Sequence, residues 1–171
     1  MVSKAPFHTP DYDARQDYRR AAGQPAMSQP QMHPDMNPFG VRVRESRDSA
    51  ECPDSKPVAQ LFDVTGSMGD IPRALQAKLP ILPESLRLSG VTGVQILSGA
   101  VGDEHTDTAP LQVGQFETDV RIDDWLNRIW LEGMGGHNGG ESYGLALYFM
   151  ARHTSHDRWD RRRRPRSVSS W

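Results

Sequence analysis

The chain has 171 residues, of which 36% are hydrophobic, and its formal net charge is −2 at pH 7. This length suits one domain of ordinary size and leaves little room for a second. The small net charge of the whole chain does not indicate a general electrostatic attraction to nucleic acid or to an anionic membrane, although it averages over a basic C-terminal end. The single cysteine, Cys52, excludes an intramolecular disulfide and a zinc cluster that needs several thiolates.

No apolar stretch in the sequence approaches the roughly 20 residues that span a bilayer. The N-terminal sequence MVSKAPFHTPDYDARQDYRR lacks the apolar centre of a secretory signal. A single cysteine also favours a reducing compartment. We therefore expect a cytoplasmic protein that has no membrane partner.

Residues 1–55 are expected to form a disordered N-terminal segment. They are rich in Pro, Gln, Asp, Arg and Met, and they show no sustained helical or strand periodicity. The composition of residues 24–34 is typical of a linker. Only residues 41–45 alternate apolar and charged side chains, which predicts a short extended piece.

Residues 56–155 are expected to form a folded α/β domain. The apolar run over residues 57–64 predicts a buried strand, which ends in a Thr-Gly-Ser-Met-Gly turn. A helix should follow at once, because Asp70 is a good N-cap and Pro72 suits the first helical turn. Residues 84–88 predict one or two further helical turns.

Strands and helices then continue to alternate. Residues 94–101 predict a second strand, and residues 111–116 predict a short edge strand. Apolar residues at helical spacing predict a helix over residues 122–131, and a glycine-rich loop over residues 133–140 leads to a last helix over residues 141–153. This order predicts the opening half of a doubly wound, mostly parallel sheet with flanking helices, in the manner of a Rossmann-like fold.

The turn after the first strand is the strongest functional signal in the sequence. Asp63, Thr65 and Ser67 occupy alternate positions, so their side chains can converge on one point at the carboxyl end of the strand. One carboxylate and two hydroxyls are hard oxygen donors, which suit Mg²⁺, Mn²⁺ or Ca²⁺ better than zinc. The sequence therefore predicts a divalent metal site, although a capped strand-to-helix turn would explain the same residues.

The stretch FDVTGSMG, residues 62–69, resembles the metal-ion-dependent adhesion site of von Willebrand factor A (VWA) domains. The resemblance covers roughly residues 57–154 and is nearest to bacterial stand-alone members of that family. Members usually carry Asp-x-Ser-x-Ser, and Thr65 departs from this pattern while keeping the hydroxyl. The resemblance implies a VWA-type fold and a non-catalytic module, in which the metal bridges to an acidic residue of a partner protein.

The resemblance also implies that two other loops complete the metal site. Asp103, after the second strand, is the expected third-party ligand, although it would serve equally as a turn residue. Glu141 is the expected substitute for the threonine or acidic residue that the family often places in the glycine-rich loop. Asn138 and Ser142 are alternatives to Glu141, which in turn would suit the N-terminus of a helix.

Three other chemistries are disfavoured by the sequence. His153, His156 and Asp157 suggest zinc, but the side chains of a His-x-x-His pair with no further ligand nearby more often simply face solvent. Residues 66–69 lack the glycine and lysine pattern of a phosphate-binding loop. No nucleophile and base lie together in the pattern, so we expect no enzymatic activity.

Residues 156–171 are expected to form a basic, disordered tail. The resemblance implies another buried strand here, but the sequence instead carries an arginine-rich run over residues 158–166. We interpret the domain as truncated and incomplete at its C-terminus, which would leave the Asp63 strand as an exposed apolar edge. The alternative function is a poorly functional fragment whose arginine run binds nucleic acid or acidic surfaces.

Overall fold

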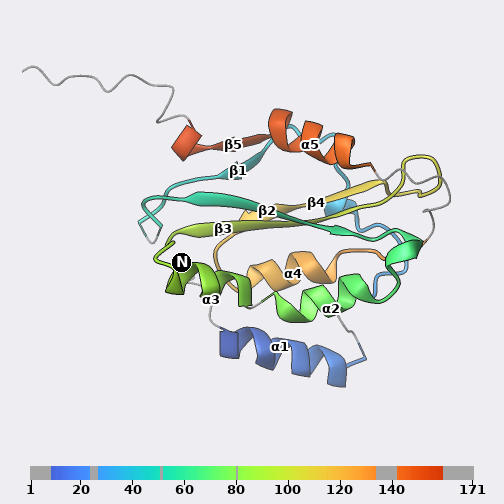
Figure 1. The fold of residues 1–171 in the computed structure, drawn as a ribbon, viewed down its shortest axis with the longest axis horizontal. Helices are drawn as coiled ribbons and strands as arrows, with labels where there is room; N and C mark the ends of the chain where they lie inside the picture. The colour runs from blue at the N-terminus through green and yellow to red at the C-terminus, as the bar shows by residue number, and fades with distance from the viewer. Residues whose placement is uncertain (1–8, 24–26, 51, 80, 134–141, 160–171) are drawn as a thin grey trace, which may run out of the picture.

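The computed structural model describes residues 9–23, 27–50, 52–79, 81–133 and 142–159. For residues 9–12, 16, 81 and 84 it describes the backbone alone. Figure 1 shows a sheet with one long helix above it and several helices below it. The expected class is confirmed at this level: the fold is α/β, with a mostly parallel sheet and flanking helices.

The main sheet has three strands in the order β2-β3-β4. Strand β2 (Lys56–Asp63) pairs in parallel with β3 (Val94–Val101), and β3 pairs antiparallel with β4 (Leu111–Glu117). All three strands were predicted, β2 and β3 from apolar runs and β4 from its alternating pattern. The parallel register places Asp63 opposite Val101, so the carboxyl ends of β2 and β3 lie side by side.

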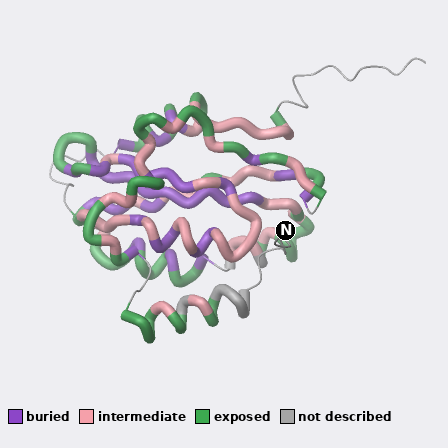
Figure 2. Tube along the Cα trace, turned by 180° about the vertical axis from the view of Figure 1, so that it is seen from behind, coloured by how far each residue is buried: buried purple, intermediate pink, exposed green. Residues whose placement is uncertain are grey.

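Side chains alternate between the two faces of this sheet, and each face has its own core. Phe62 and Ile96 lie on one face and pack with Ile122 and Leu126 of α4 (Arg121–Asn127). The opposite face buries residues of β3 and β4 against α5 (Tyr143–Arg152), through Ala146 and Phe149. Figure 2 shows the buried residues following the strands through the middle of the molecule.

Helices α2 (Ile71–Lys78) and α3 (Ile81–Leu88) follow the predicted turn and lie on the α4 side of the sheet (Figure 1). Helix α4 ends at Asn127, earlier than its apolar spacing predicts. The reason lies in Gln112 of β4, which is fully buried. Its side chain accepts from Trp130 N at 2.9 Å and donates to Trp130 O at 2.8 Å, so the backbone there bonds to the sheet instead of continuing the helix.

The N-terminal segment differs from the expected disorder. It contains helix α1 (Thr9–Ala21), a short 3-10 helix η1 (Pro34–Met36) and strand β1 (Arg44–Ser46). Met27 and Met36 are buried in the core on the α4 face. These apolar residues stand singly in the sequence, so no periodic pattern announces them, yet each fills a site on the domain.

Ion pairs fasten helix α1 to the domain. Arg19 Nε lies 3.1 Å from Oδ2 of Asp123 and its Nη2 lies 3.0 Å from Oδ1 of Asp124. Arg15 pairs with the same two carboxylates, with Nε 3.3 Å from Asp123. Long-range charge pairing of this kind has no signature in a single sequence.

A second, two-stranded sheet pairs a strand that precedes the main sheet in sequence with a strand that follows it. Strand β1 pairs in parallel with β5 (Thr154–His156), with Arg44 opposite Thr154. The short extended piece predicted at residues 41–45 is thus displaced toward the C-terminus by a few positions. Residue 156, the expected start of the basic tail, belongs to β5, whereas residues 160–171 lie outside the described part of the chain.

Candidate metal centre

The predicted turn begins where β2 leaves the sheet. Val64 N donates to Val101 O at 2.9 Å, so pairing with β3 continues one residue past Asp63. Thr65 then has extended dihedral angles and precedes a short 3-10 helix, η2 (Gly66–Met68). Gly69 ends it at a φ of 51°, in the left-handed region that favours glycine. The chain thereby reverses direction within a few residues and enters α2.

This reversal brings the three predicted ligands together. Oδ1 of Asp63 accepts hydrogen bonds from Thr65 N at 3.0 Å and from Thr65 Oγ1 at 2.7 Å. Thr65 Oγ1 lies 3.2 Å from Ser67 Oγ. Thr65 is buried and Ser67 is exposed. One carboxylate and two hydroxyls therefore form a short chain of oxygen atoms that ends at the surface.

The other oxygen of Asp63 has a partner that the sequence did not reveal. Oδ2 accepts a 2.8 Å hydrogen bond from the hydroxyl of Tyr143, the first residue of α5. Tyr143 is about half exposed, at 49%. Both oxygens of the Asp63 carboxylate are thus engaged by protein groups, one within the turn and one from α5.

Asp103 lies on the neighbouring strand end, as predicted, and its side chain is fully buried. Its Oδ1 accepts from His105 N at 2.9 Å, and its Oδ2 accepts from Thr106 Oγ1 at 3.1 Å. These bonds close a tight turn. The structure therefore gives Asp103 the turn role that the sequence left open, next to the strand that ends in Asp63.

Asp107 is a further acidic residue of this loop, and the sequence pattern did not single it out. Only 9% of it is exposed, and its Oδ2 accepts from Asp103 N at 2.7 Å. Its Oδ1 is buried and has no hydrogen-bond partner among the described residues. Burial is the main factor that raises the pKa of Asp107, and the negative charges of Glu132, Asp103 and Asp63 raise it further, against the opposing effect of the Asp103 N–H.

The glycine-rich loop is only partly described. Glu141 and Asn138, two of the candidates for the remaining ligand, lie outside the described residues. Ser142, the third candidate, is buried beside the end of β3. Its N donates to Gly102 O at 2.9 Å, and its Oγ accepts from Glu104 N at 2.8 Å. The loop thus returns to the strand end that carries Asp103.

The donor chemistry of this centre fits a hard divalent cation. Asp63, Thr65 and Ser67 supply oxygen alone, and the orphaned buried oxygen of Asp107 belongs to the adjacent loop. Among the described residues, however, no three His, Cys, Asp or Glu side chains are grouped to hold a metal ion. Hydroxyls would therefore have to complete the coordination.

The two histidines that suggested zinc have other neighbours. The ring of His153 stacks on Phe149 with centroids 5.2 Å apart, and its Nδ1 lies 3.2 Å from Arg42 O. His156 Nδ1 accepts from Trp159 N at 3.0 Å. Both side chains take part in local packing around β5.

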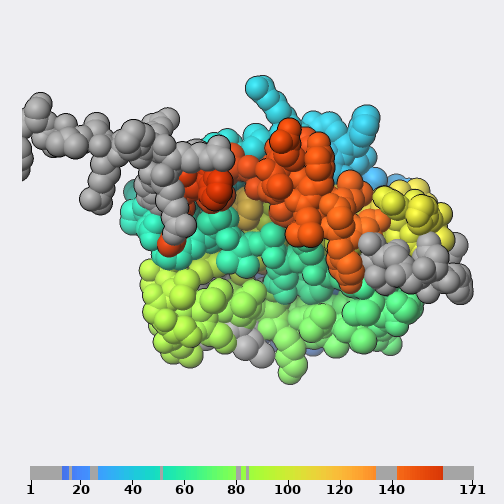
Figure 3. All heavy atoms as spheres, turned by 45° about the horizontal axis from the view of Figure 1, so that its top comes forward, coloured from blue at the N-terminus to red at the C-terminus, as the bar shows by residue number. Residues whose placement is uncertain are grey.

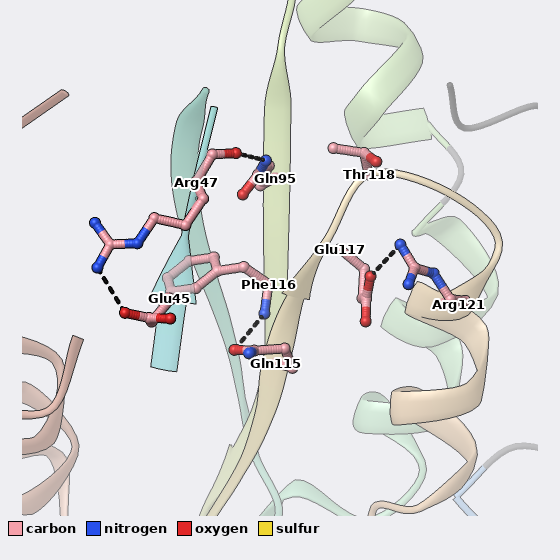
Figure 4. A pocket seen from close by; sticks show the side chains of 8 residues that line it. All are labelled: Glu45, Arg47, Gln95, Gln115, Phe116, Glu117, Thr118 and Arg121. Carbon is pink, nitrogen blue, oxygen red and sulfur yellow. Dashed lines mark hydrogen bonds and ion pairs between the residues drawn. The ribbon is translucent and has the colours of Figure 1, made fainter. Parts of the chain in front are cut away.

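A polar pocket of about 310 Å³ lies at the opposite end of the sheet from Asp63, where β3 begins and β4 ends (Figure 4). Its charged lining residues are already paired: Arg47 with Glu45 at 2.5 Å, and Arg121 with Glu117 at 2.6 Å. Gln95 lies between them and donates to Arg47 O. None of the predicted ligands lines this pocket, so the Asp63 turn stays the candidate centre.

Only Arg158 and Trp159 of the predicted arginine-rich run are described. Arg158 lies 3.9 Å from the Asp54 carboxylate, and residues 160–166 lie outside the described part of the chain.

Among the described residues, no helix is long and apolar enough to cross a membrane. No protein-family model matches the sequence, and neither a curated protein nor a solved structure gives a significant match.

Proposed function

We propose that this chain is a non-catalytic binding module of the VWA type, which uses a divalent cation at the Asp63 turn to bind an acidic residue of a partner protein. The observation that carries the proposal is the convergence of Asp63, Thr65 and Ser67 in the turn. Thr65 Oγ1 lies 2.7 Å from Asp63 Oδ1 and 3.2 Å from Ser67 Oγ. Their place at the carboxyl end of β2 is where ligands bind in open α/β sheets.

In this proposal Asp63 supplies the charged ligand, and Thr65 and Ser67 supply neutral oxygens. Mg²⁺, or Mn²⁺ or Ca²⁺, would supply a positive charge with a coordination position open to a carboxylate. Because the protein contributes few negative charges at the turn itself, the cation would keep a strong attraction for an acidic partner. Ser67 is exposed, so a partner can reach this end of the turn.

Asp103 and Asp107 support the site from the neighbouring loop. Their hydrogen bond holds the loop closed beside Asp63, and Oδ1 of Asp107 is a buried oxygen without a hydrogen-bond partner among the described residues. We assign no catalytic residue. His153 stacks on Phe149 and His156 accepts a hydrogen bond from Trp159 N, so both lie around β5 and not at the turn.

Titration of the full chain with Mg²⁺ and with Mn²⁺, followed by calorimetry and by two-dimensional NMR, tests the proposal. Saturable binding should shift the amide signals of residues 63–69, and Asp63→Ala should abolish it. Asp70→Ala is the matched control, because Asp70 is an exposed aspartate of the same segment whose side chain makes no capping hydrogen bond. Equal metal affinity in Asp63→Ala and in the unaltered chain would reject the site.

A further inference from the structure

The outer edge of β2 has no strand beside it in the described part of the chain. Lys56 N and Val64 N donate to Gly93 O and Val101 O, so the even-numbered residues of β2 direct their backbone groups toward β3. By alternation, the odd-numbered residues direct theirs outward. Ala59 and Leu61 make no hydrogen bond on that side within the described residues.

This edge has little of the protection that natural sheet edges usually carry. Such edges are commonly shortened, bulged or charged, or they contain proline. Strand β2 pairs with β3 over its whole length without a register shift, and it carries charge only at its ends, Lys56 and Asp63. Pro57 removes one outward N–H near the start, which leaves the stretch from Ala59 to Asp63 able to pair.

Exposed apolar side chains flank the same edge on both faces of the sheet. Figure 3 shows β2, in teal, as a band between α5 and the helices α2 and α3. On α2, Ile71 and Leu75 are one turn apart and are 51% and 48% exposed. On α5, Leu147 is 69% exposed. Monomeric proteins rarely leave a strand edge and its apolar borders uncovered together.

The position of Leu147 along β2 can be deduced from the Tyr143–Asp63 hydrogen bond. Tyr143 begins α5 beside the end of β2, and α5 runs back antiparallel to the strand (Figure 1). Leu147 lies one turn later on the same side of the helix, about 6 Å along its axis. That distance corresponds to about two strand residues, which places Leu147 level with Leu61.

We propose that β2 pairs antiparallel with β2 of a second copy of this chain, across a twofold axis at Leu61. The observation that favours a second copy is self-complementarity at one level of the strand. An axis there pairs Leu61 with Leu61 and Ala59 with Asp63. Pro57, which has no backbone N–H, then lies outside the residues whose N–H groups bond to the second copy. This axis also brings the two Leu147 side chains together over the centre of a continuous six-stranded sheet.

The interface so formed is isologous and apolar at its centre. Leu61 lies opposite Leu61 at the axis, and Ala59 of each copy lies opposite Asp63 of the other, so no like charges oppose each other there. The α5 helices of the two copies lie on one face of the joined sheet and the α2 helices on the other. This inference is independent of metal binding at Asp63 and would stand if the proposed function failed.

Analytical ultracentrifugation of the full chain, in the presence of a chelator, tests this inference. The unaltered chain should sediment as a dimer, and Ala59→Pro should weaken the association about tenfold or more, because it removes one outward donor in each copy. Leu147→Lys should weaken it comparably by placing like charges over the axis. Ala59→Val, which keeps the N–H, and Phe39→Lys, a 92% exposed residue near η1 on the β4 side, should leave the dimer intact.

Oxidative cross-linking adds a measurement of the register. Leu61→Cys should form an intermolecular disulfide rapidly, since opposed residues of an antiparallel pair lie within disulfide range. The unaltered chain carries the buried Cys52, so its rate of intermolecular disulfide formation is the background for this measurement. A monomeric unaltered chain would overturn the proposal, as would a dimer that Ala59→Pro and Leu147→Lys leave unchanged. Circular dichroism of each variant identifies any that fails to fold. If Ala59→Pro fails to fold, Leu147→Lys, on the surface of α5, still tests the proposal.

Discussion

The hydroxyl of Tyr143 donates a 2.8 Å hydrogen bond to Oδ2 of Asp63 and so occupies the side of the carboxylate that the turn itself leaves open. Oδ1 is already engaged by Thr65. A cation that bound Asp63 through Oδ2 would compete with the phenol for this oxygen. Tyr143 thus links the first residue of α5 to the candidate centre.

Tyr143→Phe is accordingly expected to strengthen metal binding. Removing the hydroxyl frees Oδ2 without changing the ring, and the loss of one exposed, competing hydrogen bond corresponds to about a fivefold gain in affinity. Calorimetric titration with Mn²⁺ measures this gain. Tyr148→Phe is the matched control, because Tyr148 is a similarly exposed tyrosine of α5. Weaker binding by Tyr143→Phe would show that the phenol assists the metal.

The pH dependence of stability should report the burial of Asp107. Burial raises the pKa of this carboxyl above its ordinary value, so the folded chain retains the proton to a higher pH than the unfolded chain does. Protonation therefore favours folding, and this contribution is lost as the pH rises from the ordinary carboxyl range through the raised pKa of the folded state.

Asp107→Asn removes that pH dependence, because the amide stays neutral. In chelator, the variant should match the unaltered chain at acidic pH and exceed it by on the order of 1 kcal/mol near neutral pH, the scale for one unsatisfied buried polar group. Urea denaturation across the pH range provides the measurement, with the exposed Asp70→Asn as reference. A stability difference that shrinks as the pH rises would contradict the assignment.

The contrast between Asp123 and Asp124 predicts how α1 is held. The side chain of Asp123 is 0% exposed and that of Asp124 is 36% exposed, and both face Arg15 and Arg19. Removing the buried charge weakens the charged hydrogen bonds of two part-exposed arginines, so Asp123→Asn should lower the free energy of unfolding by about 2 kcal/mol. Asp124→Asn should cost well under 1 kcal/mol.

Limited proteolysis with trypsin separates local from global effects in these variants. Cleavage after Arg15 and Arg19 should accelerate strongly in Asp123→Asn and little in Asp124→Asn, because α1 is released while the sheet persists. If α1 stays protected in Asp123→Asn, then the apolar anchors Met27 and Met36 suffice to hold the segment, and the ion pairs have only a minor role.

The parts of the fold that were predictable are those in which a local pattern decides the structure. The strands β2 and β3 follow from apolar runs and β4 follows from alternation, and the turn at Asp63 follows from its glycines and hydroxyls. The length of α4 was not predictable, because a side chain of β4, Gln112, captures the backbone of Trp130. Such a tertiary bond overrides helical spacing.

The candidate site divides in the same way. Asp63, Thr65 and Ser67 lie close together in sequence, so their convergence was predictable, whereas Tyr143 reaches Asp63 only because α5 packs on β3 and β4. Asp107 became notable only through its burial and its unpaired oxygen. The N-terminal segment was predicted to be disordered because of its composition and its lack of periodicity. Its contacts with the domain are made by single methionines and arginines that are distant in sequence from their partners, so no local pattern announced them.

The pairing of β1 with β5 has a consequence for the nascent chain. Arg44 meets Thr154, so this small sheet cannot close until nearly the whole described chain has left the ribosome. The β2–β3 ladder can form much earlier, because its strands are separated by one helical crossover. The β1–β5 sheet is therefore expected to assemble after the main sheet.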